Sequence, residues 1–395
     1  MTPPSKFVLH HVGGRWGNRV FPLLPRFERD FVNVLYEADS DAIPGIYEAC
    51  KNQQSELIVL PFCLAEGDSD ATLNLYLNSG LTSLRSFSAA LKDRHLHLFG
   101  VDFDFGGAGA RLLKRKTIAT RSLDSVLASS GDACPAPDFL SLDVQGTEYE
   151  VLAGARNVLR DKVCGVIAEV EFGEMYVGQK RFQDVYDLLR EFGFEFVRFL
   201  SLGEASGPAA PLGFRSSGYQ SWADALFLRR PDSIPTKGKN YADMLRKLCF
   251  VAIVFGNIEL AIDCLGLLRQ LAPSEAHASS DVLAYAAFIA ELAEVYERTQ
   301  KVWPPVFSRI LPQHRSLDYS RAGGPEQWPE ILEGLRDLDE HYVGSLKKLQ
   351  KPSDTEFEAL LRRYGFVEQA DRVNHTRRHQ AHDISQAIIA ARRKS

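Results

Sequence analysis

Strand-like and helix-like segments alternate along roughly the first 230 residues of the chain, and this alternation constrains the fold most. The run at 163–170 is apolar almost throughout, which is typical of a strand covered on both faces. Alternating strands and helices predict a mostly parallel sheet with helices on both faces, hence an α/β fold. The expected strands are residues 7–12, 31–36, 57–64, 71–77, 116–120, 139–142, 163–170, 194–199 and 223–229. The last two are expected to pair as an antiparallel hairpin. The expected helices are residues 41–52, 123–128, 147–159 and 182–192.

The character of the chain changes near residues 230–241, where proline, glycine and polar residues indicate a linker. Beyond it the pattern predicts helices at 241–255, 258–271, 281–297, 329–349, 354–364 and 367–379, and no strand. The turns at 255–261 and 364–370 each resemble the turn of a tetratricopeptide-like hairpin, while a plain helical bundle is the competing interpretation. We therefore expect two domains, an α/β domain at 1–232 and an all-α domain at 233–395.

Charge and cysteine usage exclude several classes of protein. The 46 basic and 51 acidic residues give a formal charge of −5, which argues against a broad nucleic-acid or anionic-membrane surface. The six cysteines form no CxxC pair, so neither a zinc cluster nor a dithiol motif is indicated, and a reducing cytoplasm fits them best. No targeting segment is evident, and the longest apolar run, 248–255, is too short to span a bilayer. We expect a cytoplasmic protein without a nucleic-acid partner.

Two constellations near the N-terminus point to an adenosine-containing cofactor. Gly13, Gly14 and Gly17 follow the first strand, where a tight turn would let the backbone approach a ligand. Glu37 ends the second strand, and a carboxylate there accepts hydrogen bonds from ribose hydroxyls. The structural alternatives are that the glycines form an ordinary strand–helix turn and that Glu37 is a solvated acid at the end of a strand. The spacing does not separate a dinucleotide from S-adenosylmethionine.

A third constellation follows the strand at 139–142. Asp143 ends this strand at the carboxyl edge of the sheet, where we expect the reactive end of a cofactor. A glycine turn follows, and a helix begins near Thr147 with Glu148 and Glu150 in its first turn. Acids at that position also favour a helix N-terminus through the helix dipole, which is the structural alternative to a role in binding.

The segment 137–155 resembles the signature of the FkbM family of S-adenosylmethionine-dependent methyltransferases. Flanking segments at 81–84, 122–127 and 169–179 resemble the same family, so the likeness spans residues 7–200, about half of the chain. The matching positions of the signature are Asp143, Gln145, Gly146, Glu148, Val151, Leu152, Gly154 and Ala155.

The resemblance implies a class I, Rossmann-like methyltransferase fold and S-adenosylmethionine as cofactor. It places the cofactor over the Gly13–Gly17 turn, its ribose on Glu37 and its adenine beside Ala65. It also implies O-methyl transfer to a hydroxyl of a sugar, a polysaccharide or another natural product, and so a role in polysaccharide biosynthesis. The C-terminal helices would offer a surface for a protein partner or for self-association.

One residue departs from the family pattern. His11 stands where the first strand usually carries Asp. A neutral histidine would hydrogen-bond the amino or carboxylate end of the cofactor, whereas a protonated one would repel the sulfonium. The alternative is a catalytically degenerate scaffold whose helical part is an interaction module. A Rossmann-type oxidoreductase is disfavoured, since the GxGxxG spacing is absent.

Methyl transfer is an in-line displacement, in which a hydroxyl acceptor profits from a base. Asp143 and Glu171 are the candidate catalytic residues, and Glu171 shares one side of its strand with Glu169. Paired acids also suit a magnesium-type cation, although the sequence does not require one. The candidate acceptor-binding residues are Glu148, Glu169, Tyr176 and Gln179.

Overall fold

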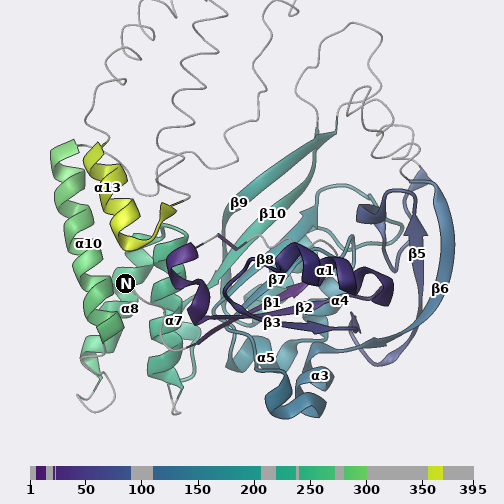
Figure 1. Ribbon diagram of the computed structural model, residues 1–395, viewed down its shortest axis with the longest axis horizontal. Coiled ribbons are helices and arrows are strands. Elements are labelled where there is room, and N and C mark those ends of the chain that lie inside the picture. The colour runs from purple at the N-terminus through teal and green to yellow at the C-terminus, as the bar shows by residue number, and fades with distance from the viewer. Residues whose placement is uncertain are drawn as a thin grey trace, which may run out of the picture. The chain divides into compact units, whose positions relative to one another are not determined.

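The computed structural model describes residues 6–14, 21–22, 24–89, 110–205, 219–236, 240–271, 280–299 and 355–367 (Figure 1). Gly17, the helix expected at 329–349 and nearly all of that expected at 367–379 lie outside these residues. The chain divides into two compact units. The first comprises 1–209 and 217–287, and the second comprises 210–216 and 288–395.

The first unit is built on a seven-stranded sheet. Its strands lie in the order β3 (Glu56–Leu60), β2 (Phe31–Tyr36), β1 (Phe7–Val12), β7 (Phe139–Leu142), β8 (Gly165–Glu171), β10 (Tyr219–Arg229) and β9 (Phe194–Ala205). The first five run parallel, while β10 pairs antiparallel with both β8 and β9. The mostly parallel α/β fold expected from the alternation is confirmed. The direction in which strands are added reverses between β1 and β7, which makes this the topological switch point.

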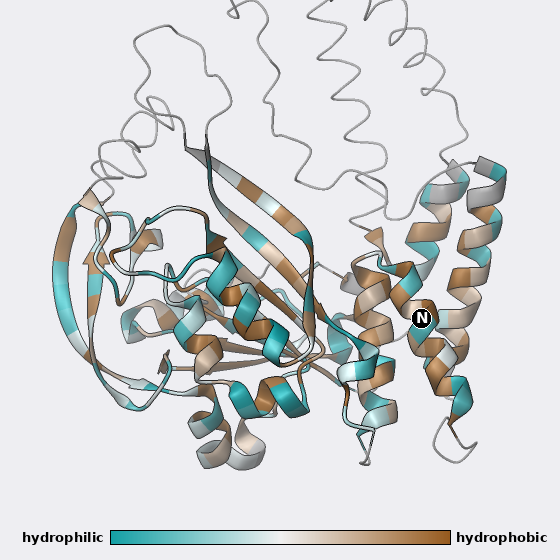
Figure 2. Cartoon of the chain, turned by 180° about the vertical axis from the view of Figure 1, so that it is seen from behind, coloured by the Kyte–Doolittle hydropathy of each residue, from teal (hydrophilic) through white to brown (hydrophobic). Residues whose placement is uncertain are grey.

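Helices cover both faces of this sheet. On one face, α3 (Leu123–Ser130), α4 (Glu148–Ala153), α5 (Arg156–Asp161) and α6 (Phe182–Glu191) share a buried core with Val8, Leu140 and Val166. On the opposite face, α1 (Ile43–Cys50) packs Ile46 and Cys50 against Leu35. Apolar residues therefore fill the strands, whereas the covering helices carry polar outer surfaces (Figure 2).

The helix α7 (Tyr241–Val254) adds an aromatic layer to the first unit. Phe250 lies with its ring centroid 5.5 Å from that of Phe7 and 6.4 Å from that of Phe31. Phe255, the residue after the helix, stacks on Phe139 at 5.7 Å. The first unit therefore includes α7 and α8 (Ile258–Gln270), which follow the domain boundary expected after residue 232.

A charged contact joins α7 to the start of β7. Lys247 donates to the carboxylate of Asp138 at 2.7 Å, and Asp138 also accepts from the backbone N–H of Val8 at 2.9 Å. Burial raises the pKa of Asp138, and the Lys247 ammonium opposes that rise. The helix is thus held to the sheet by an ion pair as well as by aromatic packing.

The strand expected at 57–64 is divided between two sheets. Residues Glu56–Leu60 form β3, whereas Cys63–Leu64 form β4 in a three-stranded sheet with β6 (Leu112–Arg121) and β5 (Ser69–Tyr76). Pro61 separates the two pieces. It has no N–H for a ladder, so a break there is expected. The long strands β5 and β6 stand at one side of the large sheet (right in Figure 1).

The single helix expected at 147–159 is in fact two helices, α4 and α5, separated at Gly154. A Cβ at Gly154 would lie 2.2 Å from the carbonyl oxygen of Ala65, so only glycine fits there. Asp124, at the start of α3, accepts from the N–H groups of Asn157 and Val158 at 2.9 and 3.1 Å. It thereby caps the first turn of α5, and a side chain distant in sequence stabilises the break.

The second unit contains the later part of α10 (Ser280–Thr299) together with α13 (Thr355–Tyr364). Phe288 lies with its ring centroid 4.8 Å from that of Tyr364 and 5.2 Å from that of Phe366. The Tyr364 hydroxyl donates to Glu291 at 2.5 Å. Among the described helices, none is long and apolar enough to cross a membrane.

Candidate active site

A pocket opens at the carboxyl ends of the parallel strands, across the switch point. Its wall consists of residues at or just after the ends of β1, β2, β3 and β7, the short strand β4, one residue of β5, and the segment around the short 3-10 helix η3 (Ser79–Leu81). The lining residues are Val12, Gly13, Tyr36, Glu37, Ala38, Phe62, Cys63, Leu64, Leu73, Ser79, Gly80, Thr82, Ser83, Leu84, Asp143, Val144, Gln145 and Thr147. The pocket thus lies where open α/β sheets bind ligands.

Glu37 lies in the wall of this pocket. Its backbone N–H donates to the carbonyl oxygen of Leu60 at 3.1 Å, which holds the residue at the end of β2. Its side-chain Oε1 accepts from the N–H of Asp39 at 2.8 Å, which orients the carboxylate. Burial raises the pKa of the neighbouring Cys63 thiol to about 12, and the negative charge of Glu37 adds to this rise. Glu37 is therefore a fixed hydrogen-bond acceptor beside an apolar wall.

Gly13 lies where the chain leaves β1, and its position requires glycine. Its φ is +93°, and a Cβ would lie 1.8 Å from the carbonyl oxygen of Asp143. The N–H groups of Gly13 and Gly14 donate to the carbonyl oxygen of Tyr36 at 3.2 and 3.1 Å. The backbone at Gly13 therefore lies close to the loop after β7, while its expected approach to a ligand stays a prediction.

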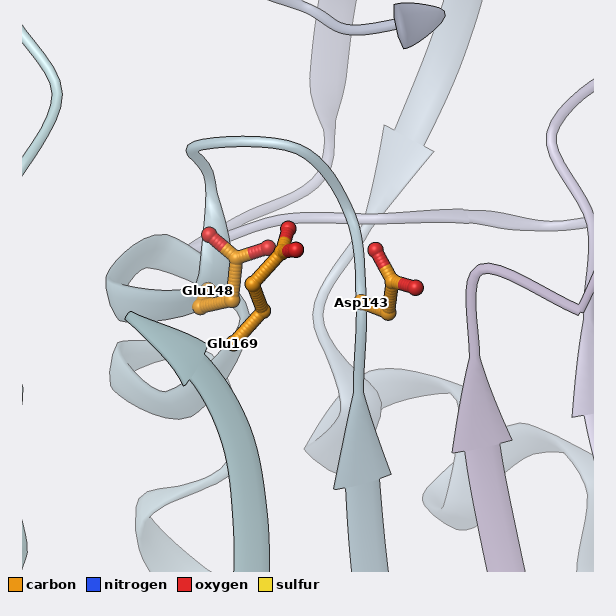
Figure 3. Close-up of side chains that lie close together, drawn as sticks. All are labelled: Asp143, Glu148 and Glu169. Atoms are coloured by element: carbon orange, nitrogen blue, oxygen red, sulfur yellow. The ribbon is translucent and has the colours of Figure 1, made fainter. Parts of the chain in front are cut away.

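Through Asp143, the pocket adjoins a group of carboxylates. Asp143 follows β7, Glu148 begins α4 and Glu169 lies in β8, and their side chains converge (Figure 3). One carboxylate oxygen from each lies within 4.8 Å of the others. Glu171, two residues beyond Glu169 on the same strand, is buried beside them. We call Asp143, Glu148, Glu169 and Glu171 the acidic cluster.

Gln145 connects two members of the acidic cluster. Its Nε2 donates to Asp143 at 2.7 Å and to Glu169 at 2.8 Å. Its Oε1 accepts from the Tyr176 hydroxyl at 2.7 Å. The backbone of Gln145 has a φ of +59°, which non-glycine residues adopt rarely and mostly at functional sites. Sequence reasoning placed Gln145 in the signature but gave it no role in the site.

Burial and mutual repulsion both favour protonation within the acidic cluster. Burial raises the pKa of Glu169 well above its usual range, and the charges of Asp143 and Glu171 raise it further. The pKa of Glu171 is raised in the same way, first by burial and then by Glu148 and Asp143. Burial also raises the pKa of Asp143, which hydrogen bonds with Gln145 and Glu169 partly offset. Neighbouring carboxylates in such a site cannot all ionise at once.

Glu148 organises the loop in which it lies. Its Oε1 accepts from the N–H of Val144 at 2.7 Å and its Oε2 from the N–H of Gly146 at 2.9 Å. Burial raises its pKa to about 7, although these backbone donors oppose the rise. Glu148 does not line the pocket, so its geometry favours shaping the turn after β7 over direct contact with an acceptor.

Two expected acceptor-binding residues are engaged within the protein. The Tyr176 ring is buried, lies 5.5 Å from the Phe87 ring in a T-shaped contact, and turns its hydroxyl to Gln145. The Oε1 of Gln179 accepts from the N–H groups of Met175 and Tyr176. Gln179 therefore shapes the loop that holds Tyr176, and Tyr176 in turn positions Gln145.

Two expected cofactor-binding residues lie away from the pocket lining. His11 is buried within β1, where its Nδ1 lies 3.0 Å from the Oγ of Ser141 in β7. Ala65 donates its N–H to the carbonyl oxygen of Arg121 and packs its own carbonyl against Gly154. The preceding residues, Phe62 to Leu64, line the pocket instead.

The segment after η3 contributes side chains to the site. Ser83 donates to the carbonyl oxygen of Gln145 at 2.7 Å, which fixes the turn after β7. The hydroxyl of Thr82 is buried in the pocket wall, and no described residue hydrogen-bonds it. The resemblance of residues 81–84 to the family was the only sequence signal for this segment. Hydrophobic periodicity could not predict that the segment contacts the loop after β7.

Residues 12–196 match the family model of the methyltransferase FkbM domain, which confirms the resemblance drawn from the signature. Among curated proteins, none matches the chain.

Solved structures with partial likeness include several methyltransferases. An FkbM methyltransferase from Methylobacillus flagellatus is 13% identical with a TM-score of 0.31, over 57% of this chain and 43% of its own. This chain therefore spans less than half the length of that relative. A TehB-like S-adenosylmethionine-dependent methyltransferase from Corynebacterium glutamicum is 11% identical with a TM-score of 0.25, over 57% of this chain and 82% of its own. TrmK of M. capricolum, in complex with S-adenosyl-homocysteine, is 6% identical with a TM-score of 0.24, over 74% of this chain and 91% of its own.

Proposed function

Because residues 12–196 carry a methyltransferase FkbM domain, we propose that this protein transfers a methyl group from S-adenosylmethionine to a hydroxyl oxygen of a sugar, a polysaccharide or a related natural product. The observation that carries the proposal is one pocket at the switch point that is lined by both Glu37 and Asp143. Synthesis of polysaccharides in the cytoplasm is the setting in which such a reaction fits the charge and cysteine content of the chain.

The polar groups of the pocket suit an adenosine-containing cofactor. Glu37 would accept hydrogen bonds from the ribose hydroxyls, and the wall from Phe62 to Leu64 would flank the adenine. The hydroxyl of Thr82, buried in the wall and without a hydrogen-bond partner among the described residues, would find one in the bound molecule. When bound, the cofactor supplies an electrophilic methyl group on a sulfonium.

The acidic cluster would serve the acceptor. When bound, the cofactor would give its methyl group to the acceptor oxygen and leave as S-adenosylhomocysteine, and a carboxylate of this chain would take the hydroxyl proton. Asp143 lines the pocket and Glu171 is buried behind it, so these two residues are our candidates for the base. A raised pKa makes a carboxylate a stronger base once it is ionised. Glu169 would hold acceptor hydroxyls beside them.

Binding of the cofactor tests the proposal. By calorimetry at neutral pH, we expect the full chain to bind S-adenosylmethionine and S-adenosylhomocysteine with micromolar affinity, and not NAD. Glu37→Ala should weaken binding by about tenfold or more, because a hydrogen bond to a charged group contributes roughly 1.5–3 kcal/mol. Glu48→Ala is the matched control, since Glu48 is exposed on α1 and pairs with Lys51. A methyl ether product, which survives mild alkali as a methyl ester does not, would then identify a hydroxyl acceptor.

Failure to bind either compound would overturn the catalytic proposal. The function would then rest on the alternative, a scaffold that keeps the fold without the chemistry. Two features favour that alternative, namely histidine at position 11 and its position outside the pocket lining, in contact with Ser141.

A further inference from the structure

The acidic cluster brings together acids that are far apart in the sequence. Asp143 comes from the end of β7, Glu148 from the first residue of α4, and Glu169 from the middle of β8. The adjacency of β7 and β8 in the sheet places them together, with ligand oxygens within 4.8 Å of one another (Figure 3). Such spacing allows three carboxylates to share one small ion.

Glu171 gives an independent indication that a positively charged group binds at the acidic cluster. Its side chain is only 2% exposed, yet its Oε1 receives no hydrogen bond from any described residue. It lies two residues beyond Glu169 in β8, so both side chains point to the same side of the strand, and the charges of Glu148 and Asp143 act on its carboxyl group. A buried carboxylate oxygen without a donor is costly, and buried charges normally pair or coordinate metals.

The nearby guanidinium does not balance this charge. Arg85 acts electrostatically on Glu171, but its Nη2 is bound to Glu150 and its Nη1 donates to the carbonyl oxygen of Val177 at 3.2 Å. Its charge is therefore shared with a carboxylate outside the acidic cluster. Four acids face one partly neutralised arginine, so either protons or a cation must offset the remainder.

Gln145 can complete a set of oxygen ligands. Its amide nitrogen now donates to Asp143 and Glu169, and its amide oxygen accepts from Tyr176. Reversing the amide places Oε1 between the two carboxylates and gives the N–H to the Tyr176 oxygen, which accepts as readily as it donates. The same side chain thus suits both a protonated cluster and an ion-bound one.

The ligand chemistry selects the type of ion. Every candidate donor is a carboxylate or amide oxygen, which suits hard cations such as Mg²⁺ and Mn²⁺. Glu148 already accepts one backbone N–H at each oxygen, and each oxygen keeps a further lone pair for an ion. We propose that Asp143, Glu148 and Glu169, with Gln145 and Glu171 beside them, form a binding site for one Mg²⁺ or Mn²⁺ ion.

This proposal does not depend on the proposed methyl transfer, although the ion site and the pocket share residues. Asp143 and Gln145 line the pocket, so a bound ion would lie at its edge. An ion there would bind an oxygen of the acceptor and make its hydroxyl more acidic.

Direct ion binding tests the site. The full chain, freed of metal with a chelator, would be titrated with Mn²⁺ while the magnetic resonance signal of free Mn²⁺ is followed. We expect one ion per chain. Glu169→Gln should weaken binding by about tenfold or more, because loss of a ligand should cost at least as much as loss of a residue that only supports one. Glu174→Gln is the matched control, because Glu174 is exposed in the loop after β8.

Thermal unfolding supplies a second measurement on the same samples. Mn²⁺ should raise the Tm of the wild type and of Glu174→Gln by similar amounts and that of Glu169→Gln by less, because the stabilisation by a ligand falls as its affinity falls. Equal Mn²⁺ affinity in wild type and Glu169→Gln, or no stoichiometric binding, would overturn the site. Binding of S-adenosylhomocysteine would be measured without metal on the same protein. If S-adenosylhomocysteine binds and Mn²⁺ does not, the ion site is wrong while the proposed function stands.

Discussion

His10 lies in the middle of β1 as a neutral, fully bonded histidine. Its Nε2 donates to the carbonyl oxygen of Pro135 at 2.8 Å, and its Nδ1 accepts from the Tyr36 hydroxyl at 3.1 Å. Burial lowers the pKa of His10 from 6.5 to about 3, and the bond to Pro135 opposes this only partly. The ring is held neutral because the surrounding core offers no water to a charged imidazole.

This residue should make the fold acid-sensitive. Between pH 6.5 and about 3 the unfolded chain binds a proton at His10 that the folded chain does not, so stability falls as pH falls through that window. Relative to His10→Gln, the wild type should lose about 2 kcal/mol of unfolding free energy between about pH 7 and about pH 5. Urea unfolding at both pH values measures this.

Comparing the wild type with His10→Gln cancels the contributions that other titrating groups make to the pH dependence of the unfolding free energy. The acidic cluster acts in the opposite direction, since the pKa of Glu148 is raised to about 7 and its protonation favours the folded state as pH falls. Equal pH dependence in wild type and His10→Gln would show that His10 is not held neutral.

At the scale of elements, α7 closes the sheet face that carries Phe7 and Phe31. Phe250 contacts both of these rings and also Phe27, at a centroid distance of 6.2 Å. The residue is fully buried. A side chain of this size buries about 150–250 Å² and contributes strongly to core stability.

Removing that ring should destabilise the first unit. Phe250→Ala should lower the free energy of unfolding by about 3–5 kcal/mol, through lost burial and the cavity left behind. Ile262→Ala on α8 is the control, since this side chain is 50% exposed. It should change stability by about 0.5 kcal/mol or less. Denaturant unfolding followed by tryptophan fluorescence measures both, and equal effects would show that α7 does not belong to the core.

At the scale of the whole molecule, the extent of the first unit decides which fragment folds. The unit reaches residue 287, and α7 supplies Lys247 to the buried carboxylate of Asp138. A chain that ends at residue 232 would leave this carboxylate unpaired and expose the aromatic layer on Phe7 and Phe139. Loss of one partner of a buried pair costs about 3–5 kcal/mol.

We therefore expect fragment 1–287 to unfold cooperatively and fragment 1–232 to be unfolded or aggregated. Circular dichroism and size-exclusion chromatography of the two fragments would measure the difference. A cooperative transition of 1–232 at the Tm of 1–287 would contradict the role of α7 and would support the domain boundary expected from the linker.

The sequence alone determined the alternation of strands and helices, the glycine turn after β1, and the positions of Glu37 and Asp143 at strand ends. These follow from local periodicity and from the spacing of neighbours along the chain, which residues encode wherever they lie in the fold. The resemblance to the FkbM family could also be recognised from the sequence alone, because its signature is one contiguous segment.

Only the tertiary structure decided which distant groups meet. The pairing of β7 with β8 brought Glu169 and Glu171 to Asp143, and the close approach of Ala65 with the cap from Asp124 divided the helix at Gly154. Packing of Phe250 on the sheet assigned α7 to the first unit. No local pattern encodes such contacts, because they depend on how complementary surfaces fit once the sheet has formed, and burial then sets the charge of the groups enclosed.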